Sequence, residues 1–187
     1  MALHDASRKG FKDILQILLR SDADIDEKDS DGKTPLHLAV KHKHIEIVKN
    51  LIENNANLNL GSNSYHTPLH YALDLGFPDI ARLLIKSGCD VNAITQSGKT
   101  PLHYAVSKRN VVLCEMLIVR GSNVNARTLT EGLTPLHCTV TKPSSRIAKL
   151  LLLYNANPEI RNLEGNTPFE HALKLKSKMI SKTIMYR

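Results

Sequence analysis

Apolar residues recur along this chain in short helical patterns that are separated by polar, glycine-containing turns. The clearest pattern covers residues 45–53, where one side of a predicted helix carries Ile47, Val48, Leu51 and Ile52. A shorter helix is predicted before it, over Thr34–Lys41. The same order appears at the start of the chain, where a helix over Asp13–Arg20 has an apolar face of Ile14, Leu15, Ile17, Leu18 and Leu19. The pattern predicts helix pairs, each a short helix followed by a longer one.

The tetrapeptide Thr-Pro-Leu-His sets the period of this pattern. It begins at Thr34, Thr67, Thr100 and Thr134, and returns in altered form as Thr167-Pro168-Phe169-Glu170, at spacings of 33, 33, 34 and 33 residues. Repetition at such a period indicates an array of one small structural unit. Each tetrapeptide is also a helix start signal, because threonine caps free backbone N–H groups and proline fits the first helical position. Its last version adds Glu170 three residues after the cap, which predicts a capping box.

The ends of the longer helices agree with one another across the repeats. The residues at these ends are of types that tolerate the left-handed conformation that commonly closes a helix, namely Asp22, Asn55, Gly88, Gly121 and Asn155.

The succession of turn, Thr-Pro-Leu-His, short helix, longer helix and a closing phrase close to Gly-Ala-Asp-Val-Asn resembles the ankyrin repeat family. The closing phrase is Gly-Cys-Asp-Val-Asn-Ala at 88–93 and Gly-Ser-Asn-Val-Asn-Ala at 121–126, and the resemblance extends over essentially the whole chain. It implies an all-α, ankyrin-repeat solenoid of stacked helix–turn–helix units with short β-turn or hairpin loops. We expect a single domain, 1–187, with repeats at about 1–28, 29–61, 62–94, 95–128, 129–161 and 162–187. The last repeat is expected to act as a cap, with Met179, Ile180, Ile184 and Met185 on one side of its final helix.

Several residues depart from the family pattern. Tyr65 stands where a turn glycine is expected, and Lys43 and Arg109 replace the glycine between the two helices of a repeat. One extra residue between Asn125 and Thr134 predicts an insertion in that turn.

Pro143 replaces the inter-helix glycine in the fifth repeat. Its ring excludes a positive φ and pushes the preceding Lys142 out of the helical region. We therefore expect this turn to differ from the turn at Gly76, and the first helix of the repeat to end early.

Composition adds little to the functional picture. The net charge is +7, but Lys and Arg are spread through the chain, so nucleic-acid binding is supported only by overall basicity. The three cysteines, Cys89, Cys114 and Cys138, lack metal-ligand spacing and are expected to be reduced thiols. The start of the chain does not look like a signal peptide, and no apolar run reaches membrane-spanning length. The expected location is cytoplasmic or nuclear.

Motifs that imitate chemical sites fail at required positions. Residues 31–34 and 97–100 look like the end of a phosphate-binding loop but lack its first glycine, and the calcium-loop-like segment from Glu27 has Leu38 where a glutamate is required. No catalytic residues, cofactor or metal are predicted. His42 and His44 are not predicted to form a site, because on a helix residues two apart point away from each other.

Five of the nine histidines belong to the repeated word itself: His4, His37, His70, His103 and His137. The resemblance implies that such histidines join neighbouring turns by hydrogen bonds.

The resemblance also places partner binding on a concave surface made of the turn tips and the exposed sides of the first helices. A basic stripe on this surface could steer a partner, although an ordinary solvated surface would look the same. Apolar residues also fall there, and Leu133, Leu163 and Leu175 are expected to cluster. The predicted partner-binding residues are Lys33, Lys41, His42, Tyr65, His66, Leu75, Lys99, Lys108, Leu133, Lys142, Leu163, Lys174 and Leu175.

The predicted function is a non-catalytic protein–protein interaction module, expected to be a monomer, that binds an acidic or amphipathic segment of another protein. One alternative is a targeting or regulatory part of a larger protein, such as a ubiquitin-ligase subunit, an enzyme or a channel. Nucleic-acid binding is a second alternative. Resemblance also suggests hydroxylation of Asn92, since Leu84 and Asp90 precede it as in hydroxylated ankyrin asparagines, but helix and turn packing explain the same residues.

Overall fold

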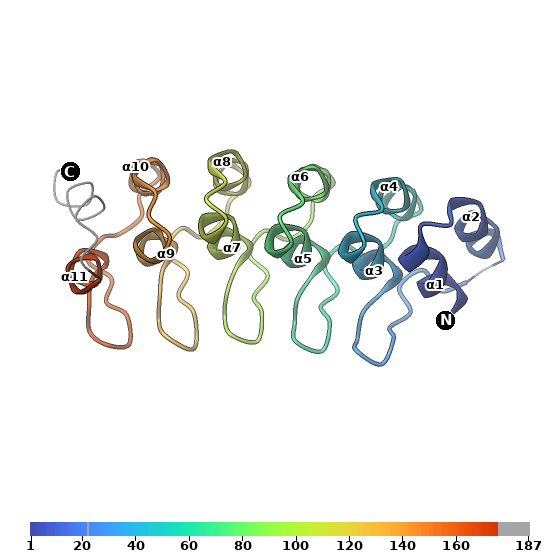
Figure 1. Cartoon of the computed structure of the whole chain (residues 1–187), viewed down its shortest axis with the longest axis horizontal. Coiled ribbons are helices and arrows are strands. Elements are labelled where there is room, and N and C mark those ends of the chain that lie inside the picture. Colours follow the sequence, from blue (N-terminus) through green and yellow to red (C-terminus); the bar gives the residue numbers. More distant parts are fainter. Residues whose placement is uncertain (22, 176–187) are drawn as a thin grey trace. The chain divides into compact units, whose positions relative to one another are not determined.

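The computed structural model describes residues 1–21 and 23–175, and all regular secondary structure in them is α-helical (Figure 1). The predicted all-α class is therefore confirmed. The chain forms two compact units, residues 1–96 and 97–187. The inference that all repeats form one domain stays a prediction.

The first unit consists of three helix pairs. The pairs are α1 (Ala2–Lys9) with α2 (Lys12–Arg20), α3 (Pro35–Lys41) with α4 (Ile45–Glu53), and α5 (Pro68–Asp74) with α6 (Pro78–Lys86). Within this unit the first helices α1, α3 and α5 form one layer, and α2, α4 and α6 form a second layer (Figure 1).

The second unit repeats this arrangement. It contains α7 (Pro101–Ser107) with α8 (Val111–Val119), α9 (Pro135–Thr141) with α10 (Ser145–Leu153), and α11 (Pro168–Lys174). Asp22 and the residues expected to form the terminal cap, Met179, Ile180, Ile184 and Met185, lie outside the described residues.

The second helices bury most of the apolar positions that the sequence pattern predicted, but α2 of the first repeat buries fewer of them. Ile47 in α4 is 1% exposed, whereas the equivalent Ile14 in α2 is 49% exposed and Ile17 is 63% exposed. The reason is that α4 packs between α2 and α6 in the second helix layer, while the structure describes one neighbour of α2 in that layer, α4. Burial of such a side chain contributes about 1.5–3 kcal/mol, so a face covered on one side contributes less to stability.

The first helices begin as predicted, at the threonine of each repeated word. Thr34 and Thr134 each accept a hydrogen bond from the backbone N–H of the histidine three residues later. The histidine ring completes a capping box, because its Nδ1 accepts the backbone N–H of the threonine, at 3.0 Å for His37. Thr167 and Glu170 form the capping box predicted from sequence.

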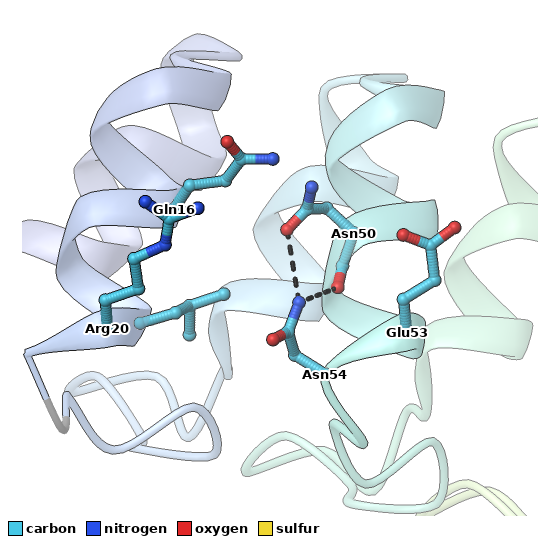
Figure 2. Close-up of a pocket in the computed structure, with 6 residues that line it drawn as sticks. Gln16, Arg20, Asn50, Glu53 and Asn54 are labelled. Atoms are coloured by element: carbon cyan, nitrogen blue, oxygen red, sulfur yellow. Dashed lines mark hydrogen bonds between the residues drawn. The ribbon is translucent and has the colours of Figure 1, made fainter.

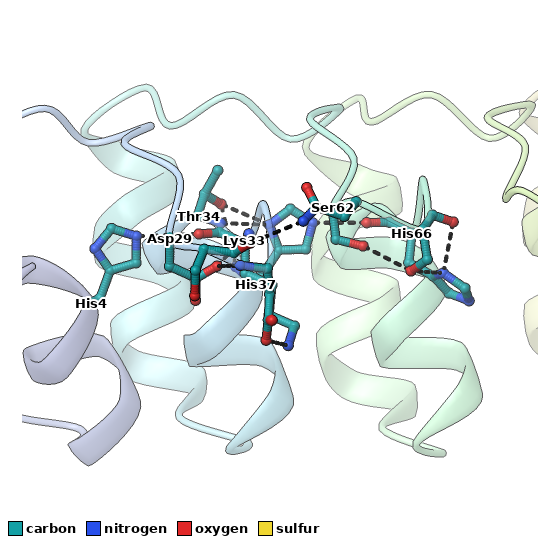
Figure 3. Close-up of polar contacts among 11 residues, drawn as sticks. His4, Asp29, Lys33, Thr34, His37, Ser62 and His66 are labelled. Atoms are coloured by element: carbon teal, nitrogen blue, oxygen red, sulfur yellow. Dashed lines mark hydrogen bonds and ion pairs between the residues drawn. The ribbon is translucent and has the colours of Figure 1, made fainter.

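The other ring nitrogen of the histidine joins one repeat to the next (Figure 3). Nε2 of His37 donates to the backbone oxygen of His66 at 2.9 Å, and Nε2 of His103 donates to that of Leu133 at 3.0 Å. Since Nδ1 accepts and Nε2 donates, these rings are neutral. Burial lowers the pKa of His37 and of His103 to about 4, although the backbone hydrogen bond acts in the opposite direction.

The longer helices are followed by left-handed residues, as the sequence predicted. Asn55 and Asn155 have φ of 63°, and Gly88 and Gly121 have φ of 84° and 87°.

Pro143 changes the turn of the fifth repeat in one of the two expected ways. Lys142 has φ −123° and ψ 82°, whereas Leu75, at the equivalent position before Gly76, has φ −77° and ψ −8°. The expectation of an early helix end is wrong, because α9 has 7 residues, as α5 does. Lys142 already lies at the C-cap, so the restriction that proline places on its predecessor falls outside the helix.

Acid should destabilise the fold through the buried histidines. Between pH 6.5, the ordinary histidine pKa, and about 4, the unfolded chain binds protons that folded His37 and His103 do not bind. Stability is therefore fully present above pH 6.5 and falls with pH, by roughly 2 kcal/mol per histidine at about pH 5. Urea unfolding at about pH 7.5 and 5 measures the loss.

His37→Gln and His103→Gln provide the control for this prediction. A glutamine amide can still donate to the neighbouring carbonyl but does not titrate, so each variant should be less stable at neutral pH and lose less stability in acid. An equal acid effect in the variants and the wild type would show that other groups cause it.

Candidate functional site

The turns that precede the first helices carry six of the thirteen predicted partner-binding residues, and backbone hydrogen bonds hold each turn in place. Within a turn, the N–H of Asp29 donates to the oxygen of Lys33 at 2.9 Å, as in a short hairpin. Between turns, the N–H of Asn63 donates to the oxygen of Asp31 at 2.9 Å. In the second unit, Leu163 donates to Glu131 in the same way, also at 2.9 Å. The described turns therefore present their side chains at a regular spacing.

The extra residue before Thr134 widens one turn. The N–H of Gly132 donates to the oxygen of Thr128, four residues earlier, while Gly32 and Gly165 donate to a residue three earlier. The predicted insertion thus lies inside the turn tip and leaves the helices in phase.

In the first unit, one predicted steering charge is already paired. Lys33 Nζ lies 2.6 Å from Asp31 Oδ2, and its side chain is only 15% exposed. The hydrogen bond to Asp31 raises the pKa of Lys33 and lowers that of Asp31. Lys41 is exposed at the end of α3 and is the clearer candidate for contact with a partner.

The prediction that His42 and His44 point apart is wrong. Their ring centroids are 6.4 Å apart and the rings are nearly parallel, with 17° between the planes. The two residues occupy the turn between α3 and α4, where helical spacing does not apply. His44 Nε2 donates to the backbone oxygen of Arg8 at 2.9 Å, and partial burial, followed by the charge of Lys41, lowers the pKa of His42.

Tyr65 and Leu75 are exposed on the first unit, whereas His66 is half-buried. Tyr65 is 62% exposed and has φ of 60°, a conformation that is costly for a bulky residue. His66 is held by Ser64, whose Oγ lies 2.9 Å from its Nδ1. Tyr65 therefore projects a large aromatic side chain from a turn that would be less strained with glycine.

In the second unit, the structure brings the three predicted leucines together. Leu133, Leu163 and Leu175 line one pocket of about 440 Å³, with Glu131 and Glu164 among its other walls. Leu163 is 65% exposed and Leu175 is 50% exposed, so an apolar side chain from a partner can reach both. The remaining lining residues are Thr130, Thr141, Asn162 and His171.

Leu133 differs from the prediction that it is exposed, since only 8% of it is accessible. Its N–H donates to Thr128 Oγ1 and its oxygen accepts from His103, which holds the residue inside the turn network. Leu133 can form the floor of the pocket but not a projecting anchor.

The predicted lysines of the second unit are all exposed, namely Lys99, Lys108, Lys142 and Lys174. Lys174 Nζ lies 2.8 Å from Glu164 Oε2, so its charge is paired.

The predicted binding residues do not include His171, a polar residue of the pocket. His171 follows Thr167 by four residues, the position that Tyr71 and Tyr104 occupy in other repeats. Its ring centroid lies 5.9 Å from that of His137, and neither of its buried nitrogens has a hydrogen-bond partner in the described part of the chain. The repeat phase could have identified His171, because it lies at a position that faces a neighbouring first helix.

Other chemistry is limited in the described residues. Burial raises the pKa of Cys114 and of Cys138 to about 12, so neither is a reactive thiolate at neutral pH. Residues 1–21 and 23–175 contain no group of three or more His, Cys, Asp or Glu placed to hold a metal. None of the helices described is long and apolar enough to cross a bilayer.

Asn92 is exposed, and its surroundings match the packing explanation given above. Leu84 is fully buried in α6, and Asp90 Oδ1 accepts the backbone N–H of Asn92 at 2.8 Å. Hydroxylation of Asn92 stays a prediction.

Comparisons with known proteins agree with the repeat architecture. A family model described as "Ankyrin repeats (3 copies)" matches residues 3–95 and 63–128, and a model of a single ankyrin repeat matches residues 131–163. Among solved structures, an ankyrin repeat domain from Acinetobacter baumannii AYE is 29% identical, with a TM-score of 0.89 over 98% of this chain and 95% of that chain. No match is found among curated proteins.

Replacing Tyr65 by glycine should stabilise the first unit. The left-handed conformation costs a non-glycine residue roughly 1–2 kcal/mol, and the greater freedom of unfolded glycine returns about 0.5–1 kcal/mol of this. We therefore expect Tyr65→Gly to raise the free energy of unfolding by about 0.5–1 kcal/mol, measured by urea denaturation.

Gly165→Tyr is the matched control, because a Cβ there meets no atom within 4 Å and φ is 81°. It should lower the stability of the second unit by a similar amount. A loss of stability in Tyr65→Gly would show that the tyrosine side chain makes compensating contacts.

Proposed function

Because this chain belongs to the ankyrin-repeat family, we propose that it binds a segment of another protein on the surface formed by its turns and first helices. Ankyrin repeats are generally protein–protein interaction modules and are typically not catalytic. The proposed partner segment is amphipathic, with an apolar residue and nearby acidic residues. We further propose that the chain acts as a monomeric adaptor in the cytoplasm or nucleus.

The pocket that contains Leu133, Leu163 and Leu175 is the observation that carries this proposal. Two exposed leucines above a buried one form a surface that gains stability when an apolar side chain displaces water from it. Glu131 and Glu164 stand at the pocket walls and disfavour an acidic side chain inside it, so the acidic residues of the partner should lie outside the pocket. An aliphatic or aromatic side chain fits both the volume and the charge of this pocket.

Exposed lysines in each unit support an acidic partner. Lys142 is exposed in the second unit, and Lys41 is exposed in the first. Charges at the rim of an interface mainly accelerate association, because they act before contact is made. Lys33 and Lys174 should contribute less, since Asp31 and Glu164 already neutralise them.

Selection of peptides from a random display library against the whole chain tests this function. We expect the selected sequences to share an apolar residue with acidic neighbours, and their binding to shift the backbone amide resonances of Leu163 and Leu175. Selected peptides that shift resonances only on α8 and α10 would contradict the proposal.

Truncating a pocket leucine should weaken binding by faster dissociation. Leu163→Ala or Leu175→Ala should cost about 1–3 kcal/mol of binding free energy with little dependence on salt, because the contact is apolar. Surface plasmon resonance with a selected peptide gives both rate constants.

Leu153→Ala is the matched control, since Leu153 is 73% exposed on α10, away from the pocket. It should leave binding unchanged. Leu133→Ala should behave differently from both, because truncating a buried leucine costs roughly 2–5 kcal/mol of folding stability. Equal binding losses in Leu153→Ala and Leu163→Ala would contradict the anchor role.

Reversing the exposed lysines should slow association. Lys41→Glu, Lys108→Glu and Lys142→Glu should each reduce the association rate constant of an acidic peptide, more at low ionic strength than at high. Thermal midpoints should change little, because surface substitutions usually alter stability by less than about 0.5 kcal/mol. Lys149→Glu on α10 provides a charge-matched control that should leave the rate unchanged.

A further inference from the structure

A second, polar pocket lies between α2 and α4, in the helix layer that does not carry the turns (Figure 2). It has a volume of about 220 Å³, and its walls are Gln16, Leu19 and Arg20 of α2, with Asn50, Glu53 and Asn54 from α4 and its C-cap. We propose that this pocket binds the carboxylate of an acidic side chain or of a chain end in a partner peptide.

The unusual residue in this pocket is Asn50. Residues at the equivalent position of other second helices are apolar, namely Ile17, Leu83, Met116 and Leu150. Asn50 is only 7% exposed, so its amide is largely removed from water. A buried amide at an otherwise apolar position costs free energy unless a hydrogen-bond partner satisfies it.

Only half of the Asn50 amide is satisfied. Asn54 Nδ2 donates to the backbone oxygen of Asn50 at 2.8 Å and to its Oδ1 at 3.3 Å, which fixes the orientation of both amides. Asn50 Nδ2 has no hydrogen-bond partner among the described residues, and Figure 2 shows this nitrogen pointing away from Asn54. The pocket therefore contains a donor, on a largely buried side chain, that is available to a ligand.

Two further donors lie across from Asn50. Gln16 and Arg20 extend from successive turns of α2, and Figure 2 shows the Gln16 amide nitrogen directed toward α4. Neither side chain has a hydrogen bond or an ion pair in the described part of the chain. A guanidinium with two amide donors matches a carboxylate, whose two oxygens accept several hydrogen bonds.

The rest of the pocket narrows the choice of anion. Leu19 supplies an apolar wall for the methylene groups that carry an acidic side chain. Glu53 lies farther from α2 than Asn50 does, and its negative charge at the rim opposes an anion of higher charge (Figure 2). A singly charged carboxylate fits this combination better than a phosphate dianion.

Nuclear magnetic resonance titration of the whole labelled chain tests the proposal. The probes are a capped peptide with one glutamate, the same peptide with glutamine, and an uncharged peptide with a free C-terminus. We expect saturable shifts of the Gln16 and Asn50 side-chain amides, with a dissociation constant on the order of a millimolar, for a carboxylate-bearing probe. Whichever of the glutamate peptide and the free C-terminus binds more tightly identifies the source of the carboxylate. The glutamine peptide should not shift the side-chain amide resonances of Gln16 or Asn50.

Two variants separate this site from general charge effects. Arg20→Gln and Asn50→Leu should each weaken binding by about tenfold or more. Asn50→Leu places the residue found in other repeats, at Leu83 and Leu150, so its thermal midpoint should not fall. Lys86→Gln removes an exposed charge at the position of α6 equivalent to Arg20, and should leave binding unchanged.

Three results would overturn the proposal. The first is an equal response to the glutamate and glutamine peptides, and the second is equal weakening by Arg20→Gln and Lys86→Gln. The third is tighter binding of inorganic phosphate than of either carboxylate probe. Because Arg20 is exposed, Arg20→Gln keeps the test valid even if Asn50→Leu does not fold. None of these results bears on the turn surface, which carries the proposed function.

Discussion

The hydrogen bond from a buried histidine to the backbone of the next turn is the interaction on which the rest of this structure depends. It joins two repeats through a donor and an acceptor that would otherwise be buried without partners. The other nitrogen of the same ring accepts from the capping threonine, so one side chain starts a helix and positions the following turn. Both roles require the neutral ring, which burial favours by lowering the pKa.

Regular placement of the turns explains why the candidate binding surface differs between repeats that have the same backbone. The positions that project are the same each time, but the side chains that surround them differ from repeat to repeat. Lys33 is neutralised by Asp31 and Lys174 by Glu164, whereas Leu163 and Leu175 share a pocket. The surface is therefore a series of local combinations, and charge counted along the chain overstates how much of it is available to a partner.

Strain and unsatisfied polarity occur at places where the chain departs from its own repeat, and two of these are Tyr65 and Asn50. Tyr65 keeps a left-handed backbone that glycine occupies in the other turns, and Asn50 places an amide where other second helices have an apolar side chain. Each departure costs stability, and each exposes a group able to contact a ligand. Tyr65 lies in the turn before α5, whereas Asn50 lies in α4, in the second helix layer (Figure 1).

The sequence by itself determined the repeat period, the helix pairs, the threonine caps and the left-handed helix ends, because these depend on residues within one turn of each other. It also identified Leu133, Leu163 and Leu175 as a cluster, since their position relative to each threonine follows from the period. Only the tertiary structure decided that Leu133 is buried, that Lys33 and Lys174 are paired, and that His42 and His44 stack. The pocket around Asn50 likewise became visible only in three dimensions. The physical reason is that burial depends on side chains from neighbouring repeats. Pairing and stacking depend on the distance between side chains of non-helical segments, which local sequence rules do not specify.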